Sequence, residues 1–163
     1  MRRGHRLQME GLPVTLKIEL LQRRDSFKAR GAVAKLLTLT DEQRAAGVVA
    51  VSGGNHGVAV AEMSAALGVR ATVVMPRTAP ARSGEIARAA GTDVRLAPTM
   101  AEAFALMERL EADGLTLLHP LADPVVIAGQ GAVGLELAAD AGPLTDILVS
   151  IGGGGLIAGV AAA

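Results

Sequence analysis

The chain has 163 residues, of which half are apolar and a fifth are charged, with 16 basic and 16 acidic side chains. This balance does not favour a polyanion or a membrane surface, so neither nucleic acid nor membrane is expected as a partner. The absence of cysteine excludes disulfides and thiolate metal sites, and His5, His56 and His119 show no ligand spacing, so no metal is predicted. No apolar run approaches the ~18 residues of a membrane helix, and the basic N-terminus lacks the apolar core of a secretory signal. A soluble cytoplasmic protein is expected.

Short runs rich in β-branched residues alternate along the chain with alanine-rich stretches of helical periodicity. The predicted strands are residues 14–19, 48–51, 71–75, 93–96, 115–118 and 146–151. The predicted helices are residues 26–38, 55–67, 81–90, 100–112 and 124–140. Runs 48–51 and 147–151 are apolar rather than alternating, which is typical of strands covered on both faces. The sequence therefore predicts an α/β fold with open, mainly parallel sheets and helices on both faces.

Four consecutive glycines follow the last predicted strand: Gly152, Gly153, Gly154 and Gly155. Residues without a Cβ let backbone N–H groups converge on an anion at the positive end of the helix that Leu156 begins. No lysine follows as in a Walker loop, and the spacing does not fit the dinucleotide pattern GxGxxG. A flexible connection is the structural alternative, and phosphate binding is the favoured interpretation of this glycine turn (residues 152–155).

A second turn, at residues 52–57, joins another buried strand to a helix. Ser52 and Asn55 could simply cap that helix, but capping needs only one polar residue. The turn also contains His56, Gly53 and Gly54, and together these residues could grip a carboxylate or a polar ring substituent. Both interpretations stay open for the turn alone.

A lysine lies at the start of the first predicted helix. Ser26 as N-cap places Phe27 and Lys28 in the first turn. The helix dipole disfavours a cation there, lowers the pKa of the amine and makes it a better nucleophile. A solvated surface lysine is the alternative for this segment by itself.

Taken together, these motifs resemble the fold type II, or β-family, pyridoxal-phosphate enzymes, and within them the serine/threonine dehydratase and serine racemase branch. Residues 17–19 and 26–32 resemble the segment of the Schiff-base lysine, residues 52–57 the carboxylate loop, and residues 152–156 the phosphate loop. Residues 119–124 and 127–136 resemble the segments that lead up to that loop. The motifs follow the family's order from Val14 to Gly159.

The resemblance implies pyridoxal 5'-phosphate as cofactor and Lys28 as the catalytic residue that holds it and removes the α-proton of the substrate. The cofactor-binding residues that it implies are Phe27, Lys28, Asn55, Gly152, Gly153, Gly154, Gly155 and Leu156. Those implied to bind an amino-acid substrate are Ser52, Gly53, Gly54, Asn55 and His56. The implied reaction is β-elimination, in which L-threonine or L-serine is dehydrated and deaminated to an α-keto acid and ammonia.

Single residues in these motifs distinguish this chain from other branches of the family. Cysteine-synthase-like members carry threonine where this chain has His56, and threonine synthases usually carry aspartate where it has Ala29. Racemases place a second serine where this chain has Gly53, so net racemisation is disfavoured. The remaining rivals are another β-family lyase, synthase or racemase with a different substrate, an inactive remnant or binding protein of the same fold, and a nucleotide-binding α/β domain.

The resemblance also implies a two-lobed architecture. Residues 1–47 are expected in the large cofactor-binding lobe and residues 48–121 in the small lobe, and residues 122–163 return to the large lobe. About half of a usual member is covered, so the chain is expected to be an incomplete, N-terminal-half fragment with little or no activity alone. Family members are commonly dimers, which makes a homodimer the implied assembly, although no pattern in the chain marks an interface.

Overall fold

The predicted parallel sheet is present in the computed structural model, which describes residues 5–9 and 11–163. Its strands run in the order β5-β4-β3-β6, and all neighbours are parallel. Their bounds are β3 (Val48–Val51), β4 (Ala71–Pro76), β5 (Asp93–Ala97) and β6 (Thr116–Leu117). The mixed α/β class is therefore confirmed, with strand bounds close to those predicted.

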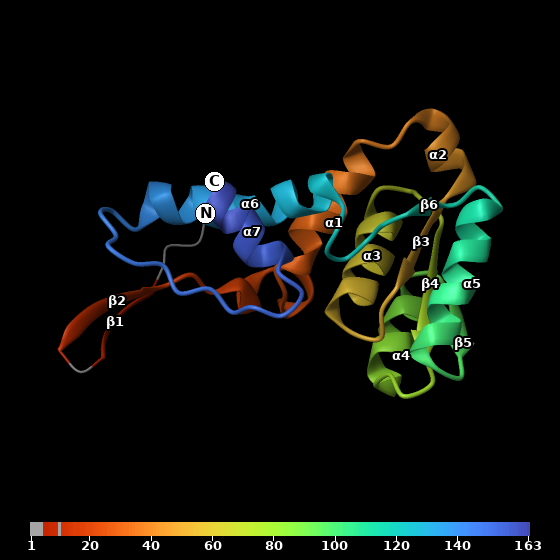
Figure 1. The fold of residues 1–163 in the computed structure, drawn as a ribbon, viewed down its shortest axis with the longest axis horizontal. Coiled ribbons are helices and arrows are strands. Elements are labelled where there is room, and N and C mark those ends of the chain that lie inside the picture. Colours follow the sequence, from red (N-terminus) through yellow and green to blue (C-terminus); the bar gives the residue numbers. More distant parts are fainter. Residues whose placement is uncertain (1–4, 10) are drawn as a thin grey trace.

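Helices cover both faces of this sheet (Figure 1). Helices α3 (Asn55–Ala66) and α4 (Ala81–Ala89) lie on one face, and α5 (Met100–Ala112) lies on the other. Successive β3 side chains alternate between the two: Ala50 packs with α3, whereas Val49 and Val51 pack with α5. Burial on both faces explains why this strand is apolar at every position.

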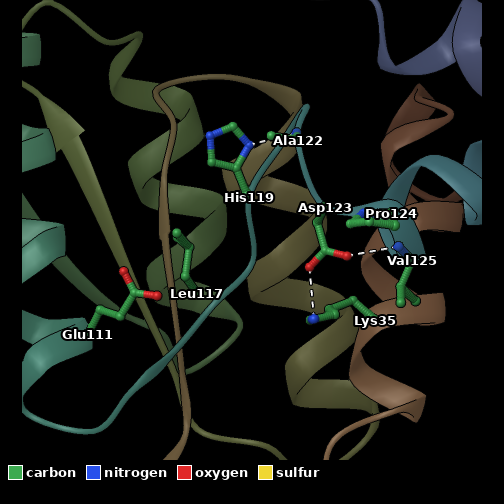
Figure 2. Close-up of a pocket in the computed structure, with 8 residues that line it drawn as sticks. All are labelled: Lys35, Glu111, Leu117, His119, Ala122, Asp123, Pro124 and Val125. Carbon is green, nitrogen blue, oxygen red and sulfur yellow. Dashed lines mark hydrogen bonds and ion pairs between the residues drawn. The ribbon is translucent and has the colours of Figure 1, made fainter.

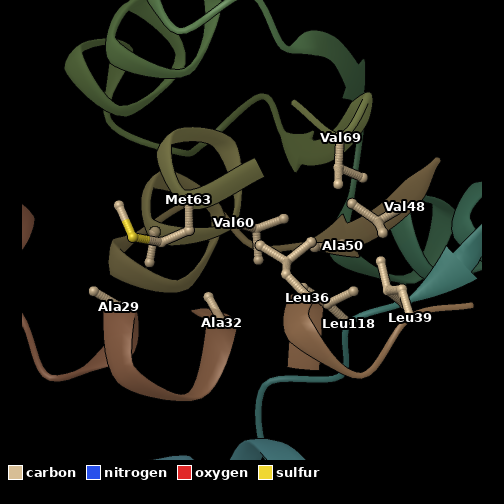
Figure 3. Close-up of a cluster of buried hydrophobic side chains, with 11 residues drawn as sticks. Ala29, Ala32, Leu36, Leu39, Val48, Ala50, Val60, Met63, Val69 and Leu118 are labelled. Atoms are coloured by element: carbon tan, nitrogen blue, oxygen red, sulfur yellow. The ribbon is translucent and has the colours of Figure 1, made fainter. Parts of the chain in front are cut away.

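Helix α1 (Lys28–Leu37) is fixed against α3 by a buried apolar cluster, shown in Figure 3. Ala32 and Leu36 of α1 are fully buried there, together with Val60 of α3 and Leu118 after β6. Four such side chains remove apolar surface worth several kcal/mol from water, by the usual area coefficient of about 25 cal/mol per Å². The packing therefore sets where the first turn of α1 lies relative to the sheet.

Two further helices, α6 (Pro124–Asp140) and α7 (Gly155–Ala162), stack beside α1 through glycines. A Cβ on Gly129 would lie 2.8 Å from the Cα of Gly31 in α1. A Cβ on Gly131 would lie 2.8 Å from the carbonyl oxygen of Gly159 in α7. Such close approach is open only to residues without a side chain, so these glycines fix the spacing of the three helices.

Several elements in the N-terminal part of the chain were not predicted. Strand β1 (His5–Met9) pairs antiparallel with β2 (Leu12–Leu16), where a longer strand over 14–19 was expected. The short helices η1 (Glu19–Leu21) and η2 (Arg23–Asp25) then lead into α1. Helix α2 (Asp41–Ala46) was also missed, although Thr40 and Gln43 form a capping box whose spacing is visible in the sequence.

The prediction of a strand at residues 146–151 is wrong. These residues have no regular structure, and no described strand pairs with them. The side chains of Ile147, Leu148 and Ile151 are 50%, 97% and 68% exposed. A strand needs a neighbour to satisfy its backbone groups, and apolar composition alone does not supply one.

Candidate active site

Lys28 is the first residue of α1, and its amine points to another part of the chain. The hydroxyl of Ser26 accepts the backbone N–H of Lys28 at 3.2 Å, which supports the start of the helix. Lys28 Nζ donates to the carbonyl oxygen of Pro120 at 3.1 Å and lies 5.2 Å from the centre of the Phe27 ring. Partial burial lowers the pKa of Lys28, because desolvation penalises its charged form. The amine is thus a better nucleophile than a solvated lysine.

The segment at residues 118–121 connects Lys28 to both glycine-containing turns. The Leu118 carbonyl oxygen lies 2.9 Å from Nε2 of His56, in the 52–57 turn. The Pro120 carbonyl oxygen accepts from Lys28, and a Cβ on Gly155 would lie 3.7 Å from the same oxygen. The structure therefore brings together the three turns that the sequence singled out.

The 52–57 turn is shaped by glycines more than by side-chain caps. Ser52 Oγ accepts the N–H of Gly54 at 3.1 Å, inside the turn, and no side chain caps α3. Asn55 opens the helix with an exposed side chain. A Cβ on Gly57 would lie 2.6 Å from the Ser52 carbonyl oxygen. The helical N–H groups are thus left for another acceptor, which the capping interpretation did not expect.

His56 is almost completely buried, at 4% exposure. Burial lowers its pKa to about 4, the Leu118 carbonyl opposes that shift, and the charge of Lys28 adds to it. The ring is therefore neutral at physiological pH, with the proton on Nε2 where it donates to Leu118. Nδ1 of the same ring has no hydrogen-bond partner in the described residues, and direct contact between the His56 ring and a substrate stays a prediction.

The glycine turn forms an open cradle at the N-terminus of α7. Gly154 has φ of +85°, a left-handed conformation that favours glycine. A Cβ on Gly153 would overlap the side chain of Leu121, whereas Cβ atoms on Gly152 and Gly154 would meet nothing within 4 Å. One side of the turn is thus packed, the other is open, and no side chain caps the helix. A helix N-terminus without a side-chain cap, next to a glycine turn with open space at Gly152 and Gly154, fits a phosphate.

A family model described as "Pyridoxal-phosphate dependent enzyme" matches residues 2–163. The chain belongs to this family. Its expected relation to pyridoxal-phosphate enzymes is therefore confirmed, and the lysine, the open glycine cradle and the 52–57 turn are the parts of the chain that fit such a cofactor.

Individual relatives agree with the predicted branch of these pyridoxal-phosphate dependent enzymes. A catabolic L-threonine dehydratase of Staphylococcus aureus (strain bovine RF122 / ET3-1) is 45% identical over 152 residues, covering 92% of this chain and 44% of that protein. The structure of maize serine racemase is 38% identical with a TM-score of 0.89, covering 93% of this chain and 46% of that chain. A processed threonine deaminase isoform 2 from Solanum lycopersicum is 42% identical with a TM-score of 0.82, covering 90% and 43%. The chain thus spans less than half the length of these relatives.

Sequence reasoning missed the ion pairs that hold the start of α1 in this family member. The Arg30 guanidinium donates two hydrogen bonds to Glu19, at 2.8 and 2.9 Å, and two to Glu136 of α6, at 2.7 and 2.9 Å. Lys17 also pairs with Glu136. Glu19 and Arg30 were interpreted as structural residues, whereas Lys17 and Glu136 were singled out only within motifs that resemble the family. The likeness of residues 127–136 to the family's motif was the one signal that α6 belongs beside the lysine segment.

A surface pocket of about 420 Å³ borders the segment at residues 117–125 (Figure 2). Its lining is Lys35, Glu111, Leu117, His119, Ala122, Asp123, Pro124 and Val125. Lys35 and Asp123 pair at 2.8 Å within it, and Glu111 is the remaining carboxylate of the lining. No residue predicted to bind cofactor or substrate lines this pocket.

The described residues contain neither a metal-binding cluster nor a helix that could span a membrane. Among residues 5–9 and 11–163, no group of three or more His, Asp or Glu side chains could hold a metal ion. Over the same ranges, every helix is too short or too polar to cross a bilayer.

Proposed function

We propose that the protein to which this chain belongs binds pyridoxal phosphate through Lys28 and eliminates water from L-threonine or L-serine, releasing an α-keto acid and ammonia. The observation that carries the proposal is the position of the Lys28 amine, 3.1 Å from a carbonyl oxygen that itself borders the glycine turn. The likeness to threonine dehydratases and deaminases supports it. Cytoplasmic location is inferred with it.

The cofactor would be held at three places. Lys28 would form the covalent link, the N–H groups of the glycine turn and Leu156 would bind the phosphate, and Asn55 would reach the ring hydroxyl. Phe27 lies beside the amine and would pack near the ring. When bound, pyridoxal phosphate supplies an aromatic electron sink for the charge left at the α-carbon.

The chain's own residues would supply binding and proton transfer. Once the substrate amine has displaced Lys28, Nζ is free to take the α-proton, and its lowered pKa favours the neutral form that this step needs. Ser52 Oγ and the N–H groups at the start of α3 would bind the substrate carboxylate. Loss of the α-proton and of the β-hydroxyl as water leaves an enamine, which tautomerises to an imine. Hydrolysis of the C=N bond of that imine gives the keto acid and ammonia.

Racemisation is the second candidate, because maize serine racemase is among the similar structures. In racemases of this branch a serine stands at the position of Gly53. Here a Cβ on Gly53 would lie 2.5 Å from the Cβ of Ala79, so the turn after β4 leaves no room for a side chain. The absence of a proton donor there favours elimination over net racemisation.

The two-lobed organisation is part of the proposal. The sheet and helices α3, α4 and α5 all lie within residues 48–121, and α1, α6 and α7 lie outside that range (Figure 1). We infer that this division separates the lobe of the 52–57 turn from the lobe of Lys28 and the glycine turn. The active site would then lie where the two lobes meet.

Reductive trapping tests the covalent link. The chain has only three lysines, Lys17, Lys28 and Lys35. After incubation with pyridoxal phosphate and borohydride reduction, we expect mass spectrometry to find the adduct on Lys28. It should disappear in Lys28→Ala and persist in Lys35→Ala, the matched control in the same helix. Labelling of all three lysines alike, or of none, would contradict the proposal.

The reaction itself is tested on the loaded protein, extended to the length of its relatives. With L-threonine or L-serine, we expect keto acid and ammonia in equal amounts, and none with Lys28→Ala. Appearance of the D-amino acid without keto acid would instead establish racemisation. A Lys28 adduct without any turnover of either substrate would indicate a binding protein or an enzyme with another substrate.

A further inference from the structure

The turn at residues 119–122 is organised by one side chain. Nδ1 of His119 accepts the backbone N–H groups of Leu121, at 3.1 Å, and Ala122, at 2.9 Å. Figure 2 shows the His119 ring beside Ala122 with the latter bond drawn. An imidazole nitrogen accepts a hydrogen bond only when it carries no proton, so Nε2 carries the proton of the neutral ring.

Few other bonds hold this turn. Before it, the N–H of Leu118 donates to Val49 in the sheet at 2.9 Å, and after it Asp123 caps α6. In the part of the chain that the structure describes, no backbone N–H of residues 119–122 donates to a backbone carbonyl. Proline at position 120 has no N–H to offer. The conformation of the turn therefore depends on His119.

The groups that this turn presents are those that meet the candidate site. The turn that His119 holds contains Pro120 and Leu121. The Pro120 carbonyl accepts a hydrogen bond from Lys28 Nζ, and the Leu121 side chain packs against Gly153. A shift of the turn would move both at once. The amine would lose its acceptor, and the packed side of the glycine turn would lose its support.

We propose that His119 is a positioning residue, which aligns the Lys28 amine with the glycine turn by fixing the Pro120 carbonyl and the Leu121 side chain. The proposal rests on the proposed function, because alignment matters only if Lys28 binds the cofactor whose phosphate the glycine turn holds. In the described residues the His119 side chain forms hydrogen bonds only with the backbone of its own turn, so it would act on Lys28 and the glycines through that backbone.

If His119 only stabilised the fold, its replacement would loosen the whole chain, whereas a positioning role predicts a local change at Lys28. Leu121 and Ala122 are exposed, so water can take over their N–H groups when His119 is replaced. The fold should then survive, and the change should be concentrated at Lys28. Two replacements of His119 separate these roles. Asparagine can accept N–H groups two or three residues ahead, as in an Asx turn, whereas leucine has no acceptor.

The test compares His119→Leu with His119→Asn in the intact chain, without cofactor. Folded protein is briefly treated with acetic anhydride, and acetylation of each lysine is measured by mass spectrometry. We expect Lys28 in His119→Leu to react about tenfold faster than in the wild type, the effect of losing one hydrogen bond of ordinary net strength. Lys17 serves as the internal reference, because its amine is paired with Glu136 and not with the 119–122 turn. In His119→Asn the Lys28 rate should return towards the wild-type value.

Pyridoxal phosphate binding is then measured by absorbance for the same three proteins. We expect His119→Leu to bind about tenfold more weakly and His119→Asn to bind nearly as the wild type does. An unchanged Lys28 acetylation rate in His119→Leu overturns the inference, as does a His119→Asn variant that behaves like His119→Leu. A parallel increase at Lys17 also overturns it, since it would report general loosening. If the protein extended to the length of its relatives binds no cofactor, while His119→Leu still changes the Lys28 acetylation rate, the proposed function is refuted and the positioning role of His119 stands.

Discussion

Burial of the His56 ring makes a single side chain sensitive to acid. Its folded-state pKa of about 4 lies below the ordinary value of 6.5, mainly because of desolvation. Protons therefore bind the unfolded chain more readily as the pH falls from 6.5 to 4, and stability is lost over that range. The shift corresponds to about 3 kcal/mol in the free energy of unfolding.

We expect the free energy of unfolding to decrease by roughly that amount, about 3 kcal/mol, between pH 7 and pH 4. In His56→Gln, which keeps a donor for Leu118 without a titrating ring, this part of the decrease should vanish. Denaturant titrations at several pH values measure it, and NMR of the imidazole reports the ionisation directly. An imidazole midpoint near 6.5 in the folded protein would show that the ring is not desolvated.

At the residue level, the sequence was informative where chemistry requires a particular residue type. Lys28 and the four glycines could be singled out because an amine at a helix N-terminus and a run without Cβ atoms are both costly in an ordinary fold. The Pro120 carbonyl could not be found in this way. Every residue has a carbonyl group, and only the tertiary structure selects the one that meets an amine 92 residues away in sequence.

Among the elements, α7 carries the glycine turn and is positioned by contact with α6. A Cβ on Gly159 would overlap the Ile127 carbonyl oxygen and lie 2.6 Å from the Gly131 nitrogen, both in backbone that cannot move aside cheaply. The spacing between the two helices is therefore set at Gly159. A larger residue there would displace the phosphate cradle along with the helix.

We expect Gly159→Ala to lower the free energy of unfolding by about 1–3 kcal/mol, the usual cost of overpacking, and to weaken pyridoxal phosphate binding. Gly84→Ala in α4 is the matched control. There a Cβ would meet, at 3.1 Å, only the movable guanidinium of Arg88. Alanine's higher helix propensity should then stabilise the chain by up to about 1 kcal/mol. Thermal unfolding distinguishes the two, and equal signs would contradict the packing argument.

Elements were predicted best where hydrophobic pattern and local signals agree. Helices α5 and α6 begin and end as expected, with Thr99 and Asp123 as side-chain caps. The 146–151 segment has the composition of a buried strand, yet it lacks a partner and stays irregular. Strand propensity describes how a residue fits a sheet, so it cannot replace a neighbouring strand.

Across the whole molecule, the pairs of Arg30 with Glu19 and Glu136 connect α1 to η1 and α6. The Arg30 hydrogen bonds, aided by Lys17, lower the pKa of Glu136 to about 2 against the opposing effect of burial. A carboxylate with a depressed folded-state pKa contributes stability above its ordinary pKa, and this contribution is lost as the pH falls through the folded value. The window lies between pH 4.5 and about 2, below the one set by His56.

We expect the network to contribute about 1 kcal/mol at neutral pH, a value discounted because the Glu136 side chain is 43% exposed. Glu136→Gln should remove about 1 kcal/mol of the stability decrease between pH 4.5 and 2 and make the unfolding less sensitive to salt. Glu108→Gln, at an exposed position of α5, is the control and should retain the wild-type acid response. If both variants keep that response, the network does not hold the helices together.

The fold class was predictable at this scale because strand and helix patterns alternate along the whole chain. The relative placement of distant parts was not, since the α1, α6 and α7 contacts depend on glycines such as Gly31 and Gly129, whose partners no local pattern identifies. A resemblance to known enzymes supplied what the pattern could not. It indicated that separate motifs belong to one site. The contacts of the 118–121 segment agree with this expectation.

The exposed apolar run at residues 147–151 also affects how the chain behaves in concentrated solution. Its side chains favour β structure, carry no charge and include no proline, and their backbone has no partner strand in the described residues. Such a stretch can template strand addition between molecules. Self-association through this run would therefore limit the solubility of the isolated chain. A partner strand that covered the run would improve both its solubility and its folding.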